Sequence, residues 1–537
     1  MDHVRTSLYV VLLANVAIAV AGHTKSPTAT SSEPSPRLLN VNRIAMLVSD
    51  RGNLLQYGWG GAVWPDTGMY PGQNPIVFDH GPWIIGKVNG VPSAAMHMWC
   101  SSYAPGPIIG GMPALWVRPQ DSSRYHPYLI SYNSSPADSD VVSWPADLGA
   151  PVNSQGKPLV FGDQLVWSIF NGADSTAFPY GYWSGNQFPR LPVEVQQSCY
   201  AQRSASETDT SLLANTVFLE WTFINKGNYP VDSCYLGFWS DIDTDYPDND
   251  VPGVDTSLQL GYCWQGSPGG GTEAVGYELL YGPAIHDPGS SAVFRGRTIP
   301  GYSNMHISAF RGIIFDNGLG DNFFSMPASI ASCWNLARGY DQAGDVMIDS
   351  VTGLPTRFPY SGDPVTHTGW IFSGPQRKGS AGILMFTGPF DLAVGDTQWM
   401  MMALIPANTG ERFASITLMR QHAQKLRALS YDYITRARPL GVTTRGVDVP
   451  GTYALYQNYP NPFNPTTTIR FAVPRRSLVT LSVFNVLGQR VETLVHEDKQ
   501  AGDYEAKFEV SNLGSGVYFY RMQAGSFVKT MKMLVLK

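Results

Sequence analysis

Five aspartates crowd one short stretch of the chain, between residues 241 and 250. They are Asp241, Asp243, Asp245, Asp248 and Asp250. In an irregular loop, alternate carboxylates can turn several hard oxygens inward, and a divalent cation then relieves their mutual repulsion. Calcium is the cation that best suits such a set outside the cell, so the five residues predict a calcium site.

This stretch is not an EF-hand loop. Tyr246 stands where the invariant glycine belongs, and Pro252 occupies the position of the bidentate glutamate. Acidic turns that face water without a metal are common, so a solvated turn remains the alternative to calcium.

The other residues that could do chemistry form no local signature of an enzyme. Met96, His97 and Met98 near Cys100 could imitate a soft-metal site, but a lone histidine among apolar residues more often belongs to a core. The chain has no H-E-x-x-H, no G-x-S-x-G and no phosphate-binding loop. We therefore expect no catalytic residues and no cofactor besides calcium, although two carboxylates on distant strands, as in a glycosidase, leave no local pattern.

Composition favours a mostly β fold. The chain has 54 Gly, 40 Pro and 12% aromatic residues, which form turns and strands, whereas charged residues reach only 15%. The apolar run 217–224 ends at the turn 225–228, so it predicts a strand for which 234–239 is the returning partner. Residues 398–406 predict another buried strand.

One amphipathic helix is expected near 409–430. Asn408 or Thr409 can cap its first turn. Its apolar positions recur at helical spacing, at Phe413, Ile416, Met419, Ala423 and Leu426. A single such helix in a β-rich chain most simply packs as a lid on one face of a sheet.

Charge and cysteine content limit the partners and the compartment. Residues 451–537 hold ten Lys/Arg and six Asp/Glu, a net charge of +4. Because the whole chain has a net charge of −6, the remaining residues have a net charge of −10. An acidic body argues against binding to nucleic acid, which requires Lys/Arg against phosphates. The five cysteines are widely spaced, without a zinc pattern, and their odd number leaves at least one thiol free or paired between chains.

The N-terminus has the pattern of an export signal. Arg5 precedes an apolar run from Leu8 to Ala21, and Ala19 and Ala21 are the small residues that a cleavage site needs. The run is too short to span a membrane, so the mature chain should have no transmembrane segment and should be extracellular or on the outer cell surface. The expected organisation is a signal peptide at 1–21, a flexible linker at 22–40, a β-rich body of one or two sandwich lobes at 41–435, a linker at 436–450 and an immunoglobulin-like β-sandwich at 451–537.

Strand signals follow one another closely in the last part of the chain. Each is bounded by Gly, Pro, Asn or Asp, and they fall at 469–473, 479–485, 490–495, 504–510, 517–522 and 527–536. Six or seven strands in so short a segment predict an immunoglobulin-like sandwich.

The tail also carries specific motifs. Their residues are Asn458, Pro460, Asn461, Pro462, Phe463, Asn464, Pro465, Gly488, Gly516 and Lys532. Together they resemble the C-terminal sorting domain of type IX secretion substrates and, more distantly, the immunoglobulin-like domain of flagellar hook-capping proteins. The resemblance implies a partner, the outer-membrane secretion machinery. The prolines of the motif lack N–H groups and fix φ, which leaves Phe463 free to plug the sandwich.

The body resembles large secreted proteins that carry the same tail and have no assigned activity. The similar segments include 83–90, 144–152, 194–197 and 362–370. This resemblance brings no catalytic residues. With no enzyme motif in the chain, we expect a non-enzymatic, structural or adhesive role, with cell-surface polysaccharide or other envelope proteins as partners. A secreted carbohydrate-active enzyme or carbohydrate-binding protein and a subunit of an extracellular assembly remain the alternatives.

Overall fold

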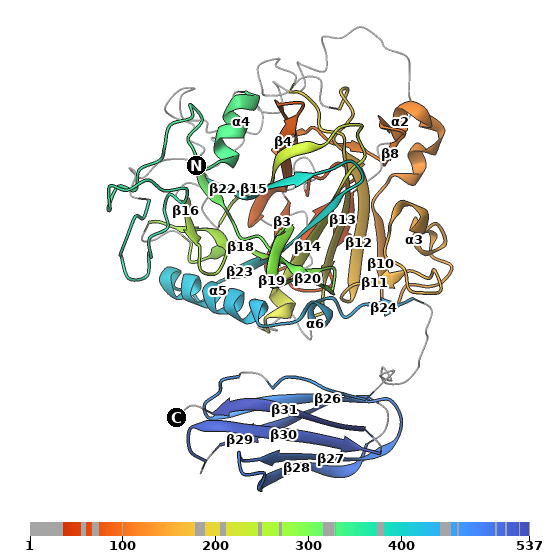
Figure 1. Ribbon diagram of the computed structural model, residues 1–537, viewed down its shortest axis with the longest axis vertical. Coiled ribbons are helices and arrows are strands. Elements are labelled where there is room, and N and C mark those ends of the chain that lie inside the picture. Colours follow the sequence, from red (N-terminus) through yellow and green to blue (C-terminus); the bar gives the residue numbers. More distant parts are fainter. Residues whose placement is uncertain are drawn as a thin grey trace. The chain divides into compact units, whose positions relative to one another are not determined.

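The computed structural model of the chain is mostly strands (Figure 1). It describes residues 36–54, 61–66, 75–98, 100–177, 188–204, 211–244, 250–267, 271–314, 327, 329–372, 381–440, 453–458, 461–499, 502–510, 513–525 and 527–535. The chain divides into two compact units, residues 1–440 and 441–537, called here the body and the tail. The predicted signal peptide lies outside the described residues.

The first sheet of the body has nine antiparallel strands. Along the main path they are β1 (Arg37–Leu39), β2 (Ala45–Val48), β3 (Ala62–Val63), β4 (Val77–Val88), β15 (Val231–Ile242), β22 (Ala381–Leu392) and β21 (Ala309–Ile314). Off this path, β5 (Val91–Met98) pairs with β4 and with β6 (Cys100–Ser101). Strand β1 lies within the segment expected to be a flexible linker at 22–40.

The second sheet of the body also has nine strands. Its path is β10 (Tyr128–Ser131), β12 (Gln164–Asn171), β13 (Val193–Ala201), β14 (Val217–Asn225), β23 (Thr397–Ala407), β18 (Ala274–Tyr281), β17 (Leu260–Gln265) and β16 (Asp250–Asp255), with β7 (Ala104–Pro105) beside β12. Residues 398–406 thus form the predicted strand.

The two sheets enclose one large apolar core. Ile84, Leu236 and Ile383 of the first sheet and Leu219 and Met402 of the second belong to it. Both sheets also bury their outer faces, so strands such as β12 and β14 are buried along almost their whole length. This is why their sequences are nearly continuous apolar runs and do not alternate with polar residues.

Helices cover the outer faces of the body sheets (Figure 1). Helix α5 (Arg412–Arg427) packs on β18 and β23 of the second sheet with Ile416, Met419, Ala423 and Leu426 buried, as predicted for a lid. Its cap is Glu411, whose side chain accepts a bond from the Ala414 N–H, so the prediction of Asn408 or Thr409 as cap is wrong. Helix α4 (Ile330–Ala337) packs on β4, β5 and β21 of the first sheet.

The pairing predicted for 217–224 and 234–239 is wrong. Both segments are strands, but β14 pairs with β13 and β23 in the second sheet, whereas β15 pairs with β4 and β22 in the first. The turn at 225–228 therefore carries the chain from one sheet to the other. The side chain of Asn225 holds this crossing through bonds from its Nδ2 to the carbonyl oxygens of Tyr229 and Leu392.

Smaller elements complete the body. They are the short helices α2 (Ala114–Val117), α3 (Ser139–Val142) and α6 (Tyr431–Thr435), the 3-10 turns Pro119–Arg124, Ala146–Leu148 and Leu213–Asn215, the two-stranded sheets β8 (Ile108–Ile109) with β9 (Met112–Pro113), β11 (Leu159–Val160) with β24 (Arg438–Pro439), and β19 (Ala284–Phe294) with β20 (Arg297–Asn304). Because β24 pairs with β11, the structured body continues into the segment expected to be a linker at 436–450.

The tail is a sandwich of two antiparallel sheets around one core. One sheet has the order β25 (Ala454–Leu455), β26 (Thr466–Val473) and β29 (Gly502–Glu509). The other has the order β28 (Arg490–Lys499), β27 (Ser477–Phe484), β30 (Gly516–Ala524) and β31 (Phe527–Val535). All six strands predicted for this segment are present.

Candidate functional site

Two motif residues of the tail, Asn461 and Phe463, bind its final strand, β31. The Asn461 side-chain oxygen accepts a hydrogen bond from the Leu534 N–H at 2.7 Å. The Phe463 N–H donates to the Leu534 carbonyl oxygen at 3.1 Å, and Phe463 forms a parallel bridge with Val535. Two residues of the motif therefore bind the same stretch of backbone, Leu534 and Val535, at the end of strand β31.

Phe463 also fills the sandwich, as predicted. Its side chain is only 3% exposed, and its ring lies 6.0 Å from the ring of Phe508, centroid to centroid. The core around it includes Val483 of β27 and Met533 of β31. Burying a phenylalanine contributes roughly 1.5–3 kcal/mol relative to leaving it exposed.

The Tyr520 hydroxyl ties the beginning of the motif to the middle of the domain. It donates to the Tyr456 carbonyl oxygen and accepts from the Asn458 N–H, both at 2.8 Å. Asn458 Nδ2 in turn donates to Thr467 Oγ1 at 3.0 Å, at the start of β26. Burial raises the pKa of Tyr520 to about 12, so the hydroxyl keeps its proton and remains a donor at neutral pH.

The remaining motif residues shape turns and strand ends. Gly488 has φ +76 in the turn after β27, a conformation that favours glycine, and Gly516 begins β30 opposite Val535. Pro465 accepts a bond from the Val510 N–H through its carbonyl oxygen, and Asn464 and Pro462 are exposed. Lys532 is exposed on β31, and its carbonyl oxygen accepts from Gln457 Nε2 at 2.8 Å. Pro460 lies outside the described residues.

The aspartates of the expected calcium site are partly described. Asp241 lies on β15 and Asp250 begins β16, and both are 4% exposed, while Asp243 is half-buried. Asp250 accepts hydrogen bonds from Thr244 and from Gln265 Nε2 at 3.1 Å. Burial, together with the nearby charges of Asp243 and Asp241, raises the pKa of Asp250 well above its usual range.

Asp245 and Asp248 fall outside the described residues, so the structure tests only part of the aspartate set. Within the described ranges, no group of three or more His, Cys, Asp or Glu side chains is arranged to hold a metal. The calcium site therefore stays a prediction.

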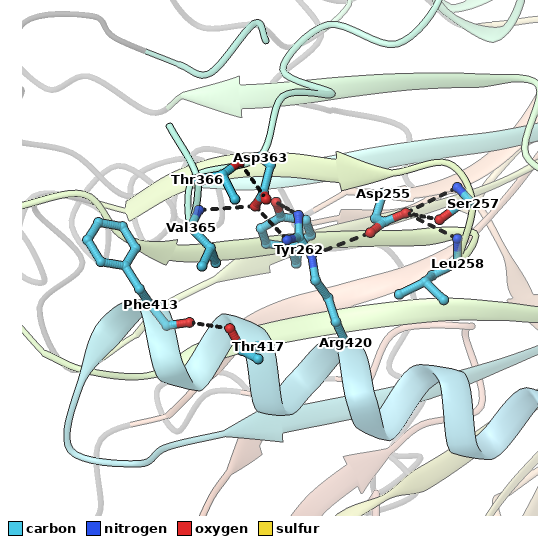
Figure 2. A network of polar contacts seen from close by, with 10 residues as sticks. All are labelled: Asp255, Ser257, Leu258, Tyr262, Asp363, Val365, Thr366, Phe413, Thr417 and Arg420. Atoms are coloured by element: carbon cyan, nitrogen blue, oxygen red, sulfur yellow. Dashed lines mark hydrogen bonds and ion pairs between the residues drawn. The ribbon is translucent and has the colours of Figure 1, made fainter. Parts of the chain in front are cut away.

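A network of polar contacts near the surface of the body centres on Arg420 of α5 (Figure 2). Its guanidinium lies 2.6 Å from Asp363 Oδ1 and 3.4 Å from Asp255 Oδ2, and donates to the Tyr262 hydroxyl at 3.2 Å. Asp363 also accepts from the Val365 N–H and from Thr366 Oγ1. Both carboxylates are thus engaged in fastening the helix and the 363–366 turn to the sheet.

A second polar site lies inside the body. His97 Nε2 lies 2.7 Å from Asp79 Oδ2, and both side chains are buried. Beside them, His80 Nδ1 lies 2.7 Å from the Tyr277 hydroxyl, which joins the two sheets through the core. Burial lowers the pKa of His80 to about 3.

The sequence pattern around Met96, His97 and Met98 thus belongs to a core, while the carboxylate partner Asp79 was missed. The two residues are 18 positions apart on neighbouring strands, a spacing without a sequence signature.

The motif residues and the two-sheet sandwich of the tail agree with a comparison with known families. Residues 457–537 match the family described as a secretion system C-terminal sorting domain. The chain thus carries the sorting tail of a type IX secretion substrate, as the motifs indicated. Such a tail implies secretion or export to the cell surface through the type IX machinery.

Other comparisons add little about the body. No curated protein matches the chain. Among solved structures, a polysaccharide lyase is 9% identical, with 85% of this chain and 47% of that chain covered and a TM-score of 0.20. A mutant of heparan sulfate lyase HepC from Pedobacter heparinus is 9% identical, with 92% and 47% covered and a TM-score of 0.21. The chain spans about half the length of both proteins, and similarity at this level carries no functional argument.

Across the described residues, no helix is both long and apolar enough to cross a membrane.

Proposed function

We propose that the tail directs this chain across the outer membrane and that the body then serves a non-enzymatic, structural or adhesive role at the cell surface. The observation that carries the proposal is the sorting domain itself, which matches over residues 457–537 and lies within a compact unit of its own. A separately folded unit can be recognised without disturbing the body. A signal peptide at 1–21 would deliver the chain to the periplasm first.

The buried carboxylates Glu220 and Glu194 stabilise the fold of the body. Glu220 accepts hydrogen bonds from Tyr200 at 2.6 Å and from Trp399 and Tyr431 at 3.2 Å each. Glu194 accepts from the Ile108 N–H at 3.0 Å and lies 2.7 Å from Lys226 Nζ. These acids tie strands, loops and helix α6 together.

Export is tested by removing the tail. A chain that ends at Leu440 should accumulate in the periplasm as a folded body, whereas a reporter with a signal peptide and residues 441–537 should reach the surface or the medium. Fractionation followed by immunoblotting measures both. Normal surface levels of the truncated chain would show that the tail is not the address.

The non-enzymatic role is tested with the purified full-length protein and panels of polysaccharides, esters and peptides. We expect no turnover, and binding to an envelope polysaccharide without turnover would favour adhesion. Turnover that disappears when one body carboxylate, such as Asp255, is changed to its amide would instead establish a carbohydrate-active or other enzyme.

One loop favours the second candidate function, a subunit of an extracellular assembly. Val346, Ile348, Val351 and Leu354 lie within nine residues and are 51%, 50%, 63% and 64% exposed. Exposed apolar side chains gathered in this way mark association surfaces more often than single ones do. If this loop mediates self-assembly, Ile348→Ser with Leu354→Ser should abolish a concentration-dependent rise in sedimentation coefficient, and a protein that sediments as a monomer at all concentrations would dismiss the candidate.

A further inference from the structure

We infer that Asn461 is a positioning residue for export, which together with Phe463 clamps the final strand so that the secretion machinery meets β31 in one fixed register. This inference rests on the proposed function of the tail as the export address. It assigns the Asn-Pro-Phe segment a task distinct from direct recognition: the segment sets the register of Leu534 and Val535 on β31.

The clamp lies on the open side of an edge strand. Within the described tail, β31 pairs along its length with β30 alone. On its other side, backbone groups of Lys532 and Leu534 point outward, as the alternation of a strand requires. Three of these groups are bonded: the Lys532 carbonyl by Gln457, the Leu534 N–H by Asn461 and the Leu534 carbonyl by the Phe463 N–H. The motif thus supplies a short substitute for a neighbouring strand.

The sequence of the motif limits this pairing to one register. Pro462 and Pro465 have no N–H, so neither can donate to β31, and the Phe463 N–H between them is the donor that does. The Phe463 ring is anchored in the core, which fixes this N–H against Leu534. An extended segment without prolines could slide along the edge, whereas this one cannot.

Register decides which side chains β31 presents. Met533 and Val535 are buried in the sandwich, while Lys532 is exposed. Because successive side chains of a strand point to opposite faces, a slip by one residue would turn Lys532 inward and Met533 outward. The last strand of a chain frays easily unless it is tied down. The clamp therefore preserves the exposed surface that the machinery would recognise.

The test uses Asn461→Ala, which removes the acceptor for the Leu534 N–H, in the full-length chain. Hydrogen exchange followed by mass spectrometry should show roughly five- to tenfold faster exchange in the peptide that covers β31, as the loss of one net hydrogen bond predicts. Export should fall several-fold while the unfolding temperature of the body stays unchanged. Asn461→Asp keeps an acceptor oxygen at the same place and should restore both properties.

The matched control is Asn485→Ala. Like Asn461, Asn485 accepts backbone hydrogen bonds through its side-chain oxygen. They come from the Leu487 and Gln489 N–H groups, in the turn after β27 and away from β31. It should leave the exchange of β31 and the export level unchanged. If Asn461→Ala unfolds the whole tail, Gln457→Ala takes its place in the same assay; it removes the bonds from Gln457 Nε2 to the Lys532 carbonyl oxygen and to Asn458 Oδ1.

The outcomes separate the clamp from the sorting assignment. One outcome is that deletion of residues 441–537 blocks export while Asn461→Ala and Gln457→Ala are exported normally despite faster exchange in β31. That result would reject the positioning role of Asn461 and keep the tail as the export signal. If the deletion itself leaves export intact, the address fails. If Asn485→Ala lost as much export as Asn461→Ala, the loss would be explained by lower stability of the whole tail. That result would overturn the inference.

Discussion

Several ionisable side chains of the body are held where water cannot reach them. Glu278 on β18 is fully buried, lies 3.0 Å from Arg427 of α5, and has a pKa that burial raises to about 8. His80 and His422 are shifted in the other direction, to about 3 and about 4, again mainly by burial. At neutral pH the folded body therefore keeps Glu278 protonated and both histidines neutral.

Glu278 should make the body less stable as pH rises. Its pKa in the folded chain is higher than in the unfolded chain, so its contribution is full below about pH 4.3 and is lost as pH rises through about 8. Between about pH 7.5 and 8.5 His80 and His422 are neutral in the folded chain and almost wholly neutral in the unfolded chain, so they add little slope. We expect Glu278→Gln to flatten the fall in unfolding temperature over this range, measured by calorimetry. The exposed Asp345→Asn serves as control, and a slope that Glu278→Gln leaves unchanged would contradict the prediction.

The aspartates at 241–250 give a second residue-level prediction. A cation among them would offset the repulsion that helps to raise the pKa of Asp250, and a ligand that binds only the folded state stabilises it by mass action. We expect calcium to raise the unfolding temperature of the body and a chelator to lower it. The shift should vanish in Asp243→Asn and persist in Asp345→Asn. Identical melting curves with calcium and with chelator would reject the site.

At the scale of elements, the contacts of Arg420 make helix α5 a fastened lid. Arg420→Met keeps the length of the side chain but leaves Asp255 and Asp363 without their cation, which should cost about 1–3 kcal/mol because the site is partly exposed. Urea denaturation of the body measures the loss. Gln424→Ala, on the exposed face of the same helix, should stay within about 0.5 kcal/mol of the native protein. Equal stabilities of the two variants would show that the network does not hold the helix.

The exposed lysine of the final strand tests what β31 presents. Lys532→Glu should lower export several-fold without a change in tail stability, because charge at an interface sets association with a complementary surface. Lys532→Arg should export normally. Lys507→Glu, exposed on β29 of the other sheet, makes the same charge change away from β31. Normal export of Lys532→Glu would remove this lysine from the recognised surface.

The local sequence pattern was enough to predict helices and strands, but not which strands pair in the same sheet. The helix at α5 and the strands of the tail could be predicted because their periodicity and turn residues are local properties. The crossing between β14 and β15 could not, since an apolar run followed by a turn looks the same whether the next strand returns to its own sheet or enters another. Similarly, Glu411 rather than Asn408 caps α5 because the body fixes where the helix begins.

The candidate site shows the same division. The residues of the tail motif were found from order and spacing, and Phe463 was expected in the core. Their hold on Leu534 was not predicted, because it joins segments more than 70 positions apart. The partners of Arg420 in the body were missed for the same reason, since Asp255 at the end of β16 and Asp363 in a turn are far from Arg420 in the sequence.

For the whole molecule, the two units should unfold separately. Each encloses its own core, with no residue shared between the clusters of the body and that of the tail. We expect two calorimetric transitions, and a chain ending at Leu440 should retain the body transition within about 1 °C. A single transition that shifts by several degrees on truncation would show that the units stabilise each other.

The positions of β22 and β23 affect how the body can fold as it emerges. Both come late in the body, yet β22 lies between β15 and β21, and β23 lies between β14 and β18. During synthesis from the N-terminus the second sheet therefore stays open between β14 and β18 until β23 is made, and in the first sheet β21 stays separated from β15 until β22 is made. Such long-range closure is slow, and the waiting strands offer unpaired edges to neighbouring chains. A holding chaperone would accordingly matter most during the interval between the synthesis of β15 and that of β23.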